Sequence, residues 1–369
     1  MKIKLFVTAL EYSANLHLKN FLKELENLKI NFELHGIFDE KIIEAKSDIN
    51  PSVFRVMGFL GVIKLIPLFL KTKKTLAQIA ATCDIAIFMD SSSFNIPLIK
   101  KIKKQNNKNP KIVYYILPQV WAWKRYRAKV LSEICDELWG ILPFEGRFYP
   151  QNANIKYVGH PLLDTLSFSY TTPQNTNKIA FMPGSRIAEI KALFPIFREL
   201  ARILNKNNKE SLLIIPHTFK DKNLAEIYGD TSDFSLEFDT QIALKKSEFA
   251  FVCSGTATLE STLFGIPTIL AYKAKALDYY IAKALVKLRF IGLANIFLEF
   301  KSGRILKEAP IHPEFLQNNI SVENLKNAYL NYDYDKFFTQ KKELLKYLDH
   351  GSTKIVAKNL EKLIKNLQK

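Results

Sequence analysis

Two short segments of this 369-residue chain end an apolar, strand-like run with small polar residues and then begin a helical pattern. In FMPGSRIAEI the run ends at Gly184, Ser185 and Arg186, and in VCSGTATLE it ends at Ser254. The free backbone N–H groups and the positive end of a helix dipole at such a turn bind anions. Two such turns indicate a diphosphate nucleotide. Neither turn carries the lysine of a P-loop, so phosphoryl transfer from a triphosphate is not supported.

The second turn continues with residues suited to a nucleotide. Gly255 lets an anion approach the backbone, and we expect Thr256 to cap the helix, with Thr258 inside its first turn. Glu260, one turn further, could accept hydrogen bonds from a vicinal diol such as a ribose. An ordinary capped helix is the alternative for this segment. The bidentate charge of Arg186 at the first turn favours the nucleotide.

Two carboxylates end strand-like runs in the first half of the chain. Asp90 is the last residue of DIAIFMD, and Glu11 comes two residues after KLFVTA. Group transfer to a hydroxyl requires a base, and we expect Asp90 in that role, with Glu11 holding the acceptor or acting as the base itself. The alternative for Asp90 is an N-cap for a helix at Phe94.

The elements that position these residues alternate between strand-like and helix-like patterns. Residues 1–168 and 179–334 each read as a parallel sheet wound with helices, and the Ser-, Thr-, Asn- and Pro-rich segment 169–178 reads as a linker. Residues 335–369 read as C-terminal helices, for which the first domain is one packing surface. Two doubly wound domains would place ligands at the carboxyl ends of their strands, in a cleft between the domains.

Composition narrows the possible partners. The formal net charge is +17, which indicates a polyanionic partner unless it reflects a generally basic proteome. The apolar share of 48% excludes a disordered chain, and three scattered cysteines without metal spacing indicate a reduced, cytoplasmic protein. We find no signal peptide and no bilayer-spanning run.

Two further segments could face a lipid. In MGFLGVIKLIPLFLK an apolar stripe with a basic edge predicts an interfacial helix, or else a helix that packs on the domain's own sheet. The residues of this segment that we assign to the membrane are Phe59, Val62, Ile63, Lys64 and Ile66. In VWAWKRYR, Trp121 and Trp123 lie beside Lys124, Arg125 and Arg127, which could hold an acylated sugar phosphate or nucleic-acid bases, or could be core tryptophans.

Ordered motifs over nearly the whole chain resemble the lipid-A-disaccharide synthase family. They are RVMGFLGVI, FMDSSSFN, LPQVWAWKRYRAKVL, LPFEGRFY, VGHPLLD, MPGSRIAEI, SGTATLESTLFGIP and LVKLRFIGLAN. The set is highly specific, although GSR or SGTATLE alone also occurs in related glycosyltransferases. The resemblance implies the α/β GT-B fold, with two Rossmann-like doubly wound parallel-sheet domains facing a central cleft. It also implies Asp90 as the catalytic aspartate, in the role of base, and Asn295 as a polar group near the donor.

The implied reaction is an inverting transfer of 2,3-diacylglucosamine from its UDP derivative to the 6-hydroxyl of 2,3-diacylglucosamine 1-phosphate (lipid X). The products are the β-1′,6-linked lipid A disaccharide precursor and UDP. The resemblance implies no metal, no cofactor and no nucleic-acid partner. It implies a cytoplasmic enzyme at the inner-membrane surface, and the sequence leaves the oligomeric state open between monomer and homodimer.

The chain departs from the family's motifs at two places. A first turn of the form G-E-x-S-G-D is here Leu10 to Asn15, which keeps Glu11 and Ser13. A motif of the form D-x-P-D-F-N is here Asp90 to Asn95, with Ser93 in place of the second Asp. We expect these changes to affect acceptor choice rather than the reaction. The rival functions are another GT-B sugar-nucleotide enzyme, such as an epimerase or a peptidoglycan glycosyltransferase, and a non-catalytic basic protein that binds lipid or RNA.

Overall fold

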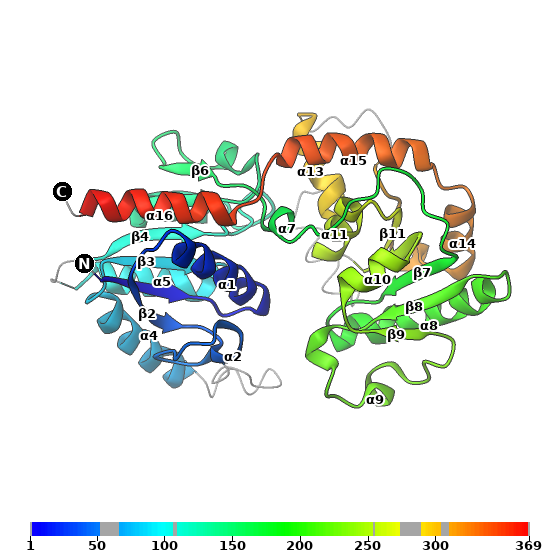
Figure 1. The fold of residues 1–369 in the computed structure, drawn as a ribbon, viewed down its shortest axis with the longest axis horizontal. Coiled ribbons are helices and arrows are strands. Elements are labelled where there is room, and N and C mark those ends of the chain that lie inside the picture. Colours follow the sequence, from blue (N-terminus) through cyan, green and yellow to red (C-terminus); the bar gives the residue numbers. More distant parts are fainter. Residues whose placement is uncertain are drawn as a thin grey trace. The chain divides into compact units, whose positions relative to one another are not determined.

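The computed structural model describes residues 2–51, 66–105, 109–253, 255–273, 289–303 and 310–367. The chain forms two compact units, which Figure 1 shows in sequence colours. The first consists of Met1–Asp164 together with Leu348–Lys369, and the second of Thr165–Tyr347.

The first unit is built on a parallel sheet of six described strands in the order β2-β1-β3-β4-β5-β6. The strands are β1 (Ile3–Thr8), β2 (Phe32–Ile37), β3 (Ile85–Met89), β4 (Lys111–Tyr115), β5 (Glu137–Gly140) and β6 (Ile155–Tyr157). The direction of winding reverses between β1 and β3, which pair from Leu5 with Ile85 to Thr8 with Phe88. In doubly wound sheets this reversal opens a binding place at the carboxyl ends of the two strands.

Apolar side chains alternate between the two faces of this sheet, so helices cover both. On one face, α1 (Tyr12–Asn27) and α16 (Thr353–Leu367) pack against each other and the strands. On the other face lie α4 (Ile66–Ala80), α5 (Ser92–Lys103) and α6 (Tyr126–Ile134). Short helical turns are α2 (Glu40–Ile43), η2 (Glu145–Phe148) and α7 (Pro161–Asp164).

The second unit repeats the design with the strand order β12-β11-β10-β7-β8-β9. The strands are β7 (Lys178–Met182), β8 (Glu210–Ile214), β9 (Ser235–Glu237), β10 (Phe249–Val252), β11 (Thr268–Tyr272) and β12 (Glu314–Leu316). The reversal falls between β7 and β10, which pair from Phe249 with Ile179 to Val252 with Met182.

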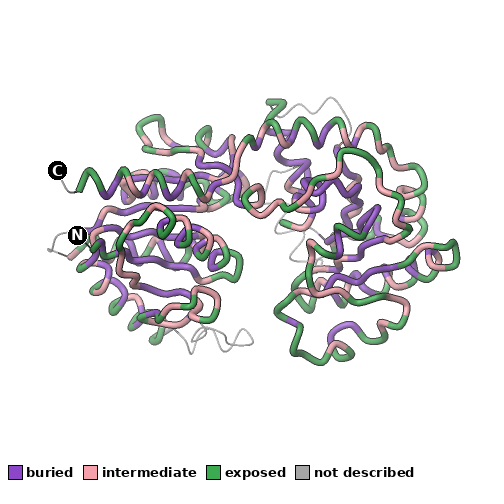
Figure 2. The backbone as a smooth tube through the Cα atoms, viewed as in Figure 1, coloured by how far each residue is buried: buried purple, intermediate pink, exposed green. Residues whose placement is uncertain are grey.

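Helices also cover both faces of the second sheet. α8 (Ile187–Asn205) and α14 (Val322–Leu330) pack on one face, and α10 (Thr240–Lys246) and α11 (Thr256–Phe264) on the other. The remaining described helices are η3 (His217–Phe219), α9 (Leu224–Tyr228), α13 (Leu293–Lys301), η4 (Gln317–Asn319) and α15 (Tyr334–Leu348). Figure 2 shows the central strands of each unit buried along most of their length, with the outward sides of the helices exposed.

The predicted α/β class and the alternation of elements are confirmed. The helices expected from Ile187 and Thr256 begin at these residues. The C-terminal segment is divided, since its last helix, α16, belongs to the first unit while residues up to Tyr347 belong to the second. The expected linker 169–178 lies within the second unit, where the backbone N–H of Tyr170 donates to the carbonyl of Phe264 at 2.8 Å.

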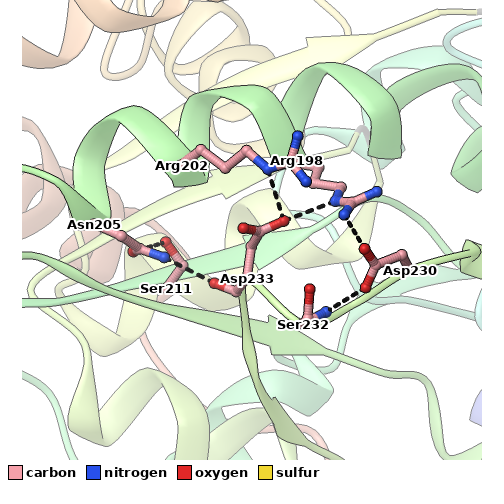
Figure 3. Close-up of polar contacts among 7 residues, drawn as sticks. All are labelled: Arg198, Arg202, Asn205, Ser211, Asp230, Ser232 and Asp233. Atoms are coloured by element: carbon pink, nitrogen blue, oxygen red, sulfur yellow. Dashed lines mark hydrogen bonds and ion pairs between the residues drawn. The ribbon is translucent and has the colours of Figure 1, made fainter.

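A polar network fastens α8 to the segment before β9 (Figure 3). The Asp233 carboxylate accepts from Nε of Arg198 at 2.7 Å and from Nε of Arg202 at 3.0 Å. Arg198 also donates to Asp230, and the Asn205 amide donates to the backbone carbonyl of Asp233 at 2.8 Å. The network holds α8, the helix that begins directly after the predicted anion turn at Gly184–Arg186.

Candidate functional site

The two predicted anion turns of the second unit lie at the ends of the paired strands β7 and β10 and line one pocket of about 360 Å³. Gly184, Ser185 and Arg186 line it from the first turn, and Gly255, Thr256 and Ala257 from the second. The N-termini of α8 and α11 therefore open at the same pocket. Their helix dipoles favour a bound anion there.

In the first turn, the backbone conformation requires Gly184 and the Arg186 side chain is exposed. Gly184 has a φ of +120°, and a Cβ there would come within 2.7 Å of Oε2 of Glu189. The Glu189 carboxylate accepts from the backbone N–H of Arg186 at 3.3 Å and from its guanidinium at 2.6 Å. The Arg186 side chain stays 77% exposed, so it is oriented yet reachable. Glu189 was not singled out from the sequence, although its position three residues after Arg186 is a capping-box spacing.

The second turn differs from the prediction in its cap. Gly255, with a φ of +115°, is the N-cap of α11, and Thr256 is the exposed first helical residue, so the prediction of a Thr256 cap was wrong. A positive φ suits glycine and is costly for threonine. A Cβ on Gly255 would meet no described atom within 4 Å, which leaves room for a ligand at the backbone. Ser254 lies outside the described residues.

The Thr258 and Asn295 side chains do not line the pocket. Thr258 is buried, and its hydroxyl donates to the Gly255 carbonyl at 2.9 Å and accepts from the backbone N–H of Leu293 at 3.2 Å. Asn295 is fully buried, and its amide donates to Glu314 at 2.7 Å and to the His312 carbonyl at 3.0 Å. Both side chains are used internally, so the prediction that they contact the donor is corrected to a supporting role.

Glu260 lies half-buried in α11, outside the set of residues that line the pocket. Burial and the nearby Asp239 carboxylate raise the pKa of Glu260 to about 7. Both causes disfavour the charged form. A carboxyl group with a pKa near 7 is partly ionised at neutral pH, and its ionised form can accept hydrogen bonds from ligand hydroxyls.

In the first unit, Glu11 and Asp90 follow β1 and β3, the strands at which the winding reverses. Glu11 is exposed at the N-cap of α1, where its side chain makes no capping bond. Asp90 has a φ of 48° and Ser91 a φ of 24°, which are strained values for non-glycine residues. Since Ser91 is the N-cap of α5, Asp90 is not the helix cap considered as its alternative role.

The strained turn at Asp90 is held through its backbone. The Asn95 amide donates to the carbonyls of Met89 and Asp90, each at 3.0 Å, and the Tyr114 hydroxyl also donates to the Asp90 carbonyl. The Asn95 oxygen accepts from the Thr8 hydroxyl at 3.0 Å, which links the ends of β1 and β3. Burial raises the pKa of Asp90, partly opposed by a hydrogen bond from the Ser91 N–H. A raised pKa makes its carboxylate a stronger base.

Asn15 holds the backbone of the Glu11 turn in a similar way. This buried amide donates to the carbonyls of Ala9 at 2.9 Å and Glu11 at 2.8 Å, and its oxygen accepts from the backbone N–H of Asp39 at 2.8 Å. An aspartate at this position could not make the two donations. The Asn15 side chain is thus fully used in holding the Glu11 turn.

Of the remaining predicted acceptor residues, some are exposed, one is buried and the others lie outside the described residues. Ser13 is exposed in the first turn of α1. Trp121 is buried edge-on against Phe144, with ring centroids 5.6 Å apart, whereas Trp123 is 42% exposed with Lys124 4.3 Å above its ring. Phe59, Val62, Ile63 and Lys64 lie outside the described residues, as does the side chain of Ile66, the first residue of α4. Of the two tryptophans, Trp123 alone is placed to contact a ligand, and the prediction for Trp121 is corrected to a core role.

Solved structures of low sequence identity share this architecture. The calicheamicin glycosyltransferase CalG4 superposes with a TM-score of 0.60 at 10% identity, covering 100% of this chain and 99% of that chain. The S. aureus MnaA–UDP co-structure gives a TM-score of 0.57 at 12% identity, covering 100% of this chain and 97% of that chain. These likenesses confirm the fold, two Rossmann-like units of the GT-B type.

Sequence relatives are much closer. The family model described as lipid-A-disaccharide synthetase matches residues 5–357. The lipid-A-disaccharide synthase of Helicobacter pylori (strain G27) is 44% identical over 365 residues, covering 98% of each chain. That of Campylobacter jejuni (strain RM1221) is 44% identical over 376 residues, covering 97% of this chain and 99% of the relative. The chain therefore belongs to the lipid-A-disaccharide synthase family.

Proposed function

We propose that this chain is a glycosyltransferase that moves 2,3-diacylglucosamine from its UDP derivative to the 6-hydroxyl of 2,3-diacylglucosamine 1-phosphate. The observation that carries the proposal is the pocket at the carboxyl ends of β7 and β10, where two helix N-termini and Arg186 face the same space. That combination suits the diphosphate of a sugar nucleotide.

The donor binds in this proposal at the strand ends of the second unit. Its diphosphate contacts the backbone of the Gly184 and Gly255 turns and the Arg186 guanidinium, which line the pocket. Its ribose extends beyond these lining residues to Glu260 in α11. As the bond between the anomeric carbon and the diphosphate breaks, negative charge grows on the departing UDP. Groups already aimed at that charge stabilise the transition state without reorganising.

The acceptor binds at the strand ends of the first unit. Asp90 takes the proton of the attacking 6-hydroxyl, whose oxygen forms the new bond to the anomeric carbon from the side opposite the leaving UDP. The configuration therefore inverts to β. The strained backbone at Asp90 and Ser91 is held by hydrogen bonds, which keeps the carboxylate in one place. The entropic cost of positioning the base is therefore met before the reaction begins. Glu11 and the exposed Trp123 contact the acceptor sugar.

The acceptor's acyl chains require contact with a lipid phase, and we propose peripheral binding to the inner face of the cytoplasmic membrane. The net charge of +17 favours anionic headgroups. On α4, Leu70 is 60% exposed and Leu68 is 37% exposed, next to the exposed Lys71 and Lys74. In the part of the chain that the structure describes, every helix is too short or too polar to cross a bilayer.

The proposal is tested by measuring UDP release in a matched set of reactions. We expect release only when acylated UDP-glucosamine and acylated glucosamine 1-phosphate are both present, and little release with unacylated UDP-N-acetylglucosamine. Interconversion of UDP-sugars without an acceptor would instead favour an epimerase. UDP affinity indistinguishable from zero in calorimetry would favour a non-catalytic basic protein.

A further inference from the structure

One buried cation of the first unit has no anionic partner among the residues that the structure describes. Arg127, in the first turn of α6, is 8% exposed. Its guanidinium donates to the hydroxyl of Ser92 at 2.5 Å and to that of Ser93 at 3.2 Å, and it lies 5.7 Å from the centroid of the Trp123 ring. Among the described residues, no carboxylate lies within ion-pair distance of it. A buried charge without a counter-charge is costly to keep.

The surroundings add to this positive charge. Ser92 and Ser93 are the first two residues of α5, so Arg127 joins the N-terminal turns of two helices, α5 and α6. Neither helix has an acidic residue in its first turn. Cations are unfavourable at helix N-termini, where the dipole is positive. A buried arginine and two dipole ends of the same sign therefore meet here without an ion-paired carboxylate from the described part of the chain.

The two serines are also oriented for a ligand. Each hydroxyl oxygen accepts from the guanidinium, so its own hydrogen is left to donate to another group. Ser93 and Trp123 are exposed, which opens this place to solvent on one side. A carboxylate at position 93 would pair with Arg127, whereas Ser93 leaves the guanidinium without a counter-charge among the described residues.

We infer that Arg127, Ser92 and Ser93 bind the phosphate group of the acceptor, with Trp123 beside its sugar. This inference rests on the proposed function, since it assigns the acceptor's 1-phosphate to the same strand end that carries Asp90. The diphosphate of the donor is assigned to the second unit, so the two anions occupy separate places. Planar bidentate donation and two hydroxyl donors suit a phosphate dianion.

The inference is tested with two acceptors that differ only in the phosphate, diacylglucosamine 1-phosphate and diacylglucosamine with a free anomeric hydroxyl. We expect Arg127→Gln to raise the KM for the phosphorylated acceptor at least tenfold and to leave the KM for the other acceptor and the UDP affinity unchanged. Lys129→Gln removes the same charge from an exposed position on α6 and should change neither KM. An equal loss with both acceptors, or an unchanged KM for the phosphorylated one, would overturn the inference.

A second variant keeps the test decisive if Arg127→Gln folds poorly. Ser93→Asp supplies an internal carboxylate for Arg127. It should therefore retain or raise the thermal stability while weakening the binding of the phosphorylated acceptor.

Direct binding measurements separate this inference from the proposed function. By calorimetry, glucosamine 1-phosphate should bind the wild type and lose affinity in Ser93→Asp, whereas glucosamine should not distinguish the two proteins. If inorganic phosphate bound as tightly as glucosamine 1-phosphate, the site would not be specific for the acceptor, and the inference would be contradicted. A wild type that binds glucosamine 1-phosphate but transfers no sugar would refute the proposed function alone.

Discussion

Glu260 is the residue whose charge state should control nucleotide binding near neutral pH. Its pKa is raised to about 7 by burial and by Asp239, whereas a ribose diol donates its hydrogen bonds to the ionised carboxylate. Below pH 7 the proton must leave before the ligand binds, so affinity should rise with pH. We expect uridine to bind about tenfold more tightly at pH 8 than at pH 6, by linkage to one ionisation.

Two controls isolate this effect. Glu260→Gln should bind uridine weakly with little dependence on pH, and 2′-deoxyuridine should show a smaller pH dependence with the wild type. Calorimetry at both pH values measures each affinity. The same steep dependence in Glu260→Gln would assign the titration to another group.

Asp90 should govern the chemical step rather than the binding of UDP. Asp90→Asn keeps the shape of the side chain and removes its basicity, so turnover should fall by about 100-fold or more. Because burial raises the pKa of Asp90, wild-type turnover should fall as the pH drops through that raised pKa and level off above it. A variant with near-normal turnover would move the base to Glu11.

Asn15 should be a positioning residue whose amide cannot be replaced by an acid. Asn15→Asp removes the two donations to Ala9 and Glu11 and turns a buried carboxylate toward their carbonyl oxygens. We expect a loss of about 1–3 kcal/mol in the free energy of unfolding. The loss should grow with pH, since the new carboxyl is easier to bury protonated. Denaturant midpoints at two pH values test this, with Asn20→Asp on the same helix as the control; equal effects at the two positions would contradict it.

At the scale of elements, the network on α8 should stabilise the second unit without contacting the nucleotide. Asp233→Asn weakens the acceptor shared by Arg198 and Arg202, so we expect the Tm to fall by about 2–4 °C while UDP affinity is retained. Arg186→Ala, at the start of the same helix, should show the reverse, with UDP weakened more than uridine and the Tm little changed. A loss of UDP affinity in Asp233→Asn would show that the network also positions the pocket.

The elements were predictable where the sequence pattern is strong. Apolar runs ending in small polar residues located β3, β7 and β10 and the turns after them, because parallel strands buried on both faces read as continuous apolar segments. β12 was missed because three residues carry almost no periodicity. The internal roles of Thr258 and Asn295 were missed as well. They depend on contacts with Leu293, His312 and Glu314 that chain spacing does not reveal.

At the scale of the molecule, the two units share one design for placing polar groups. Each winds its sheet outward from a central pair of strands, β1 and β3 or β7 and β10, and leaves polar groups at the carboxyl ends of that pair. At these strand ends the first unit has the carboxylates Glu11 and Asp90, and the second has the pocket formed by two helix N-termini and Arg186. This difference matches what an acceptor hydroxyl and a leaving diphosphate require.

The most direct measurement is the mass and linkage of the product formed from acylated UDP-glucosamine and diacylglucosamine 1-phosphate. With the wild type we predict one new species, the β-1′,6-linked tetraacylated disaccharide 1-phosphate, formed in equal amount to the UDP released. Asp90→Asn should bind UDP as the wild type does and form almost none of it. UDP released without a disaccharide, or a disaccharide of another linkage, would contradict the proposed transfer.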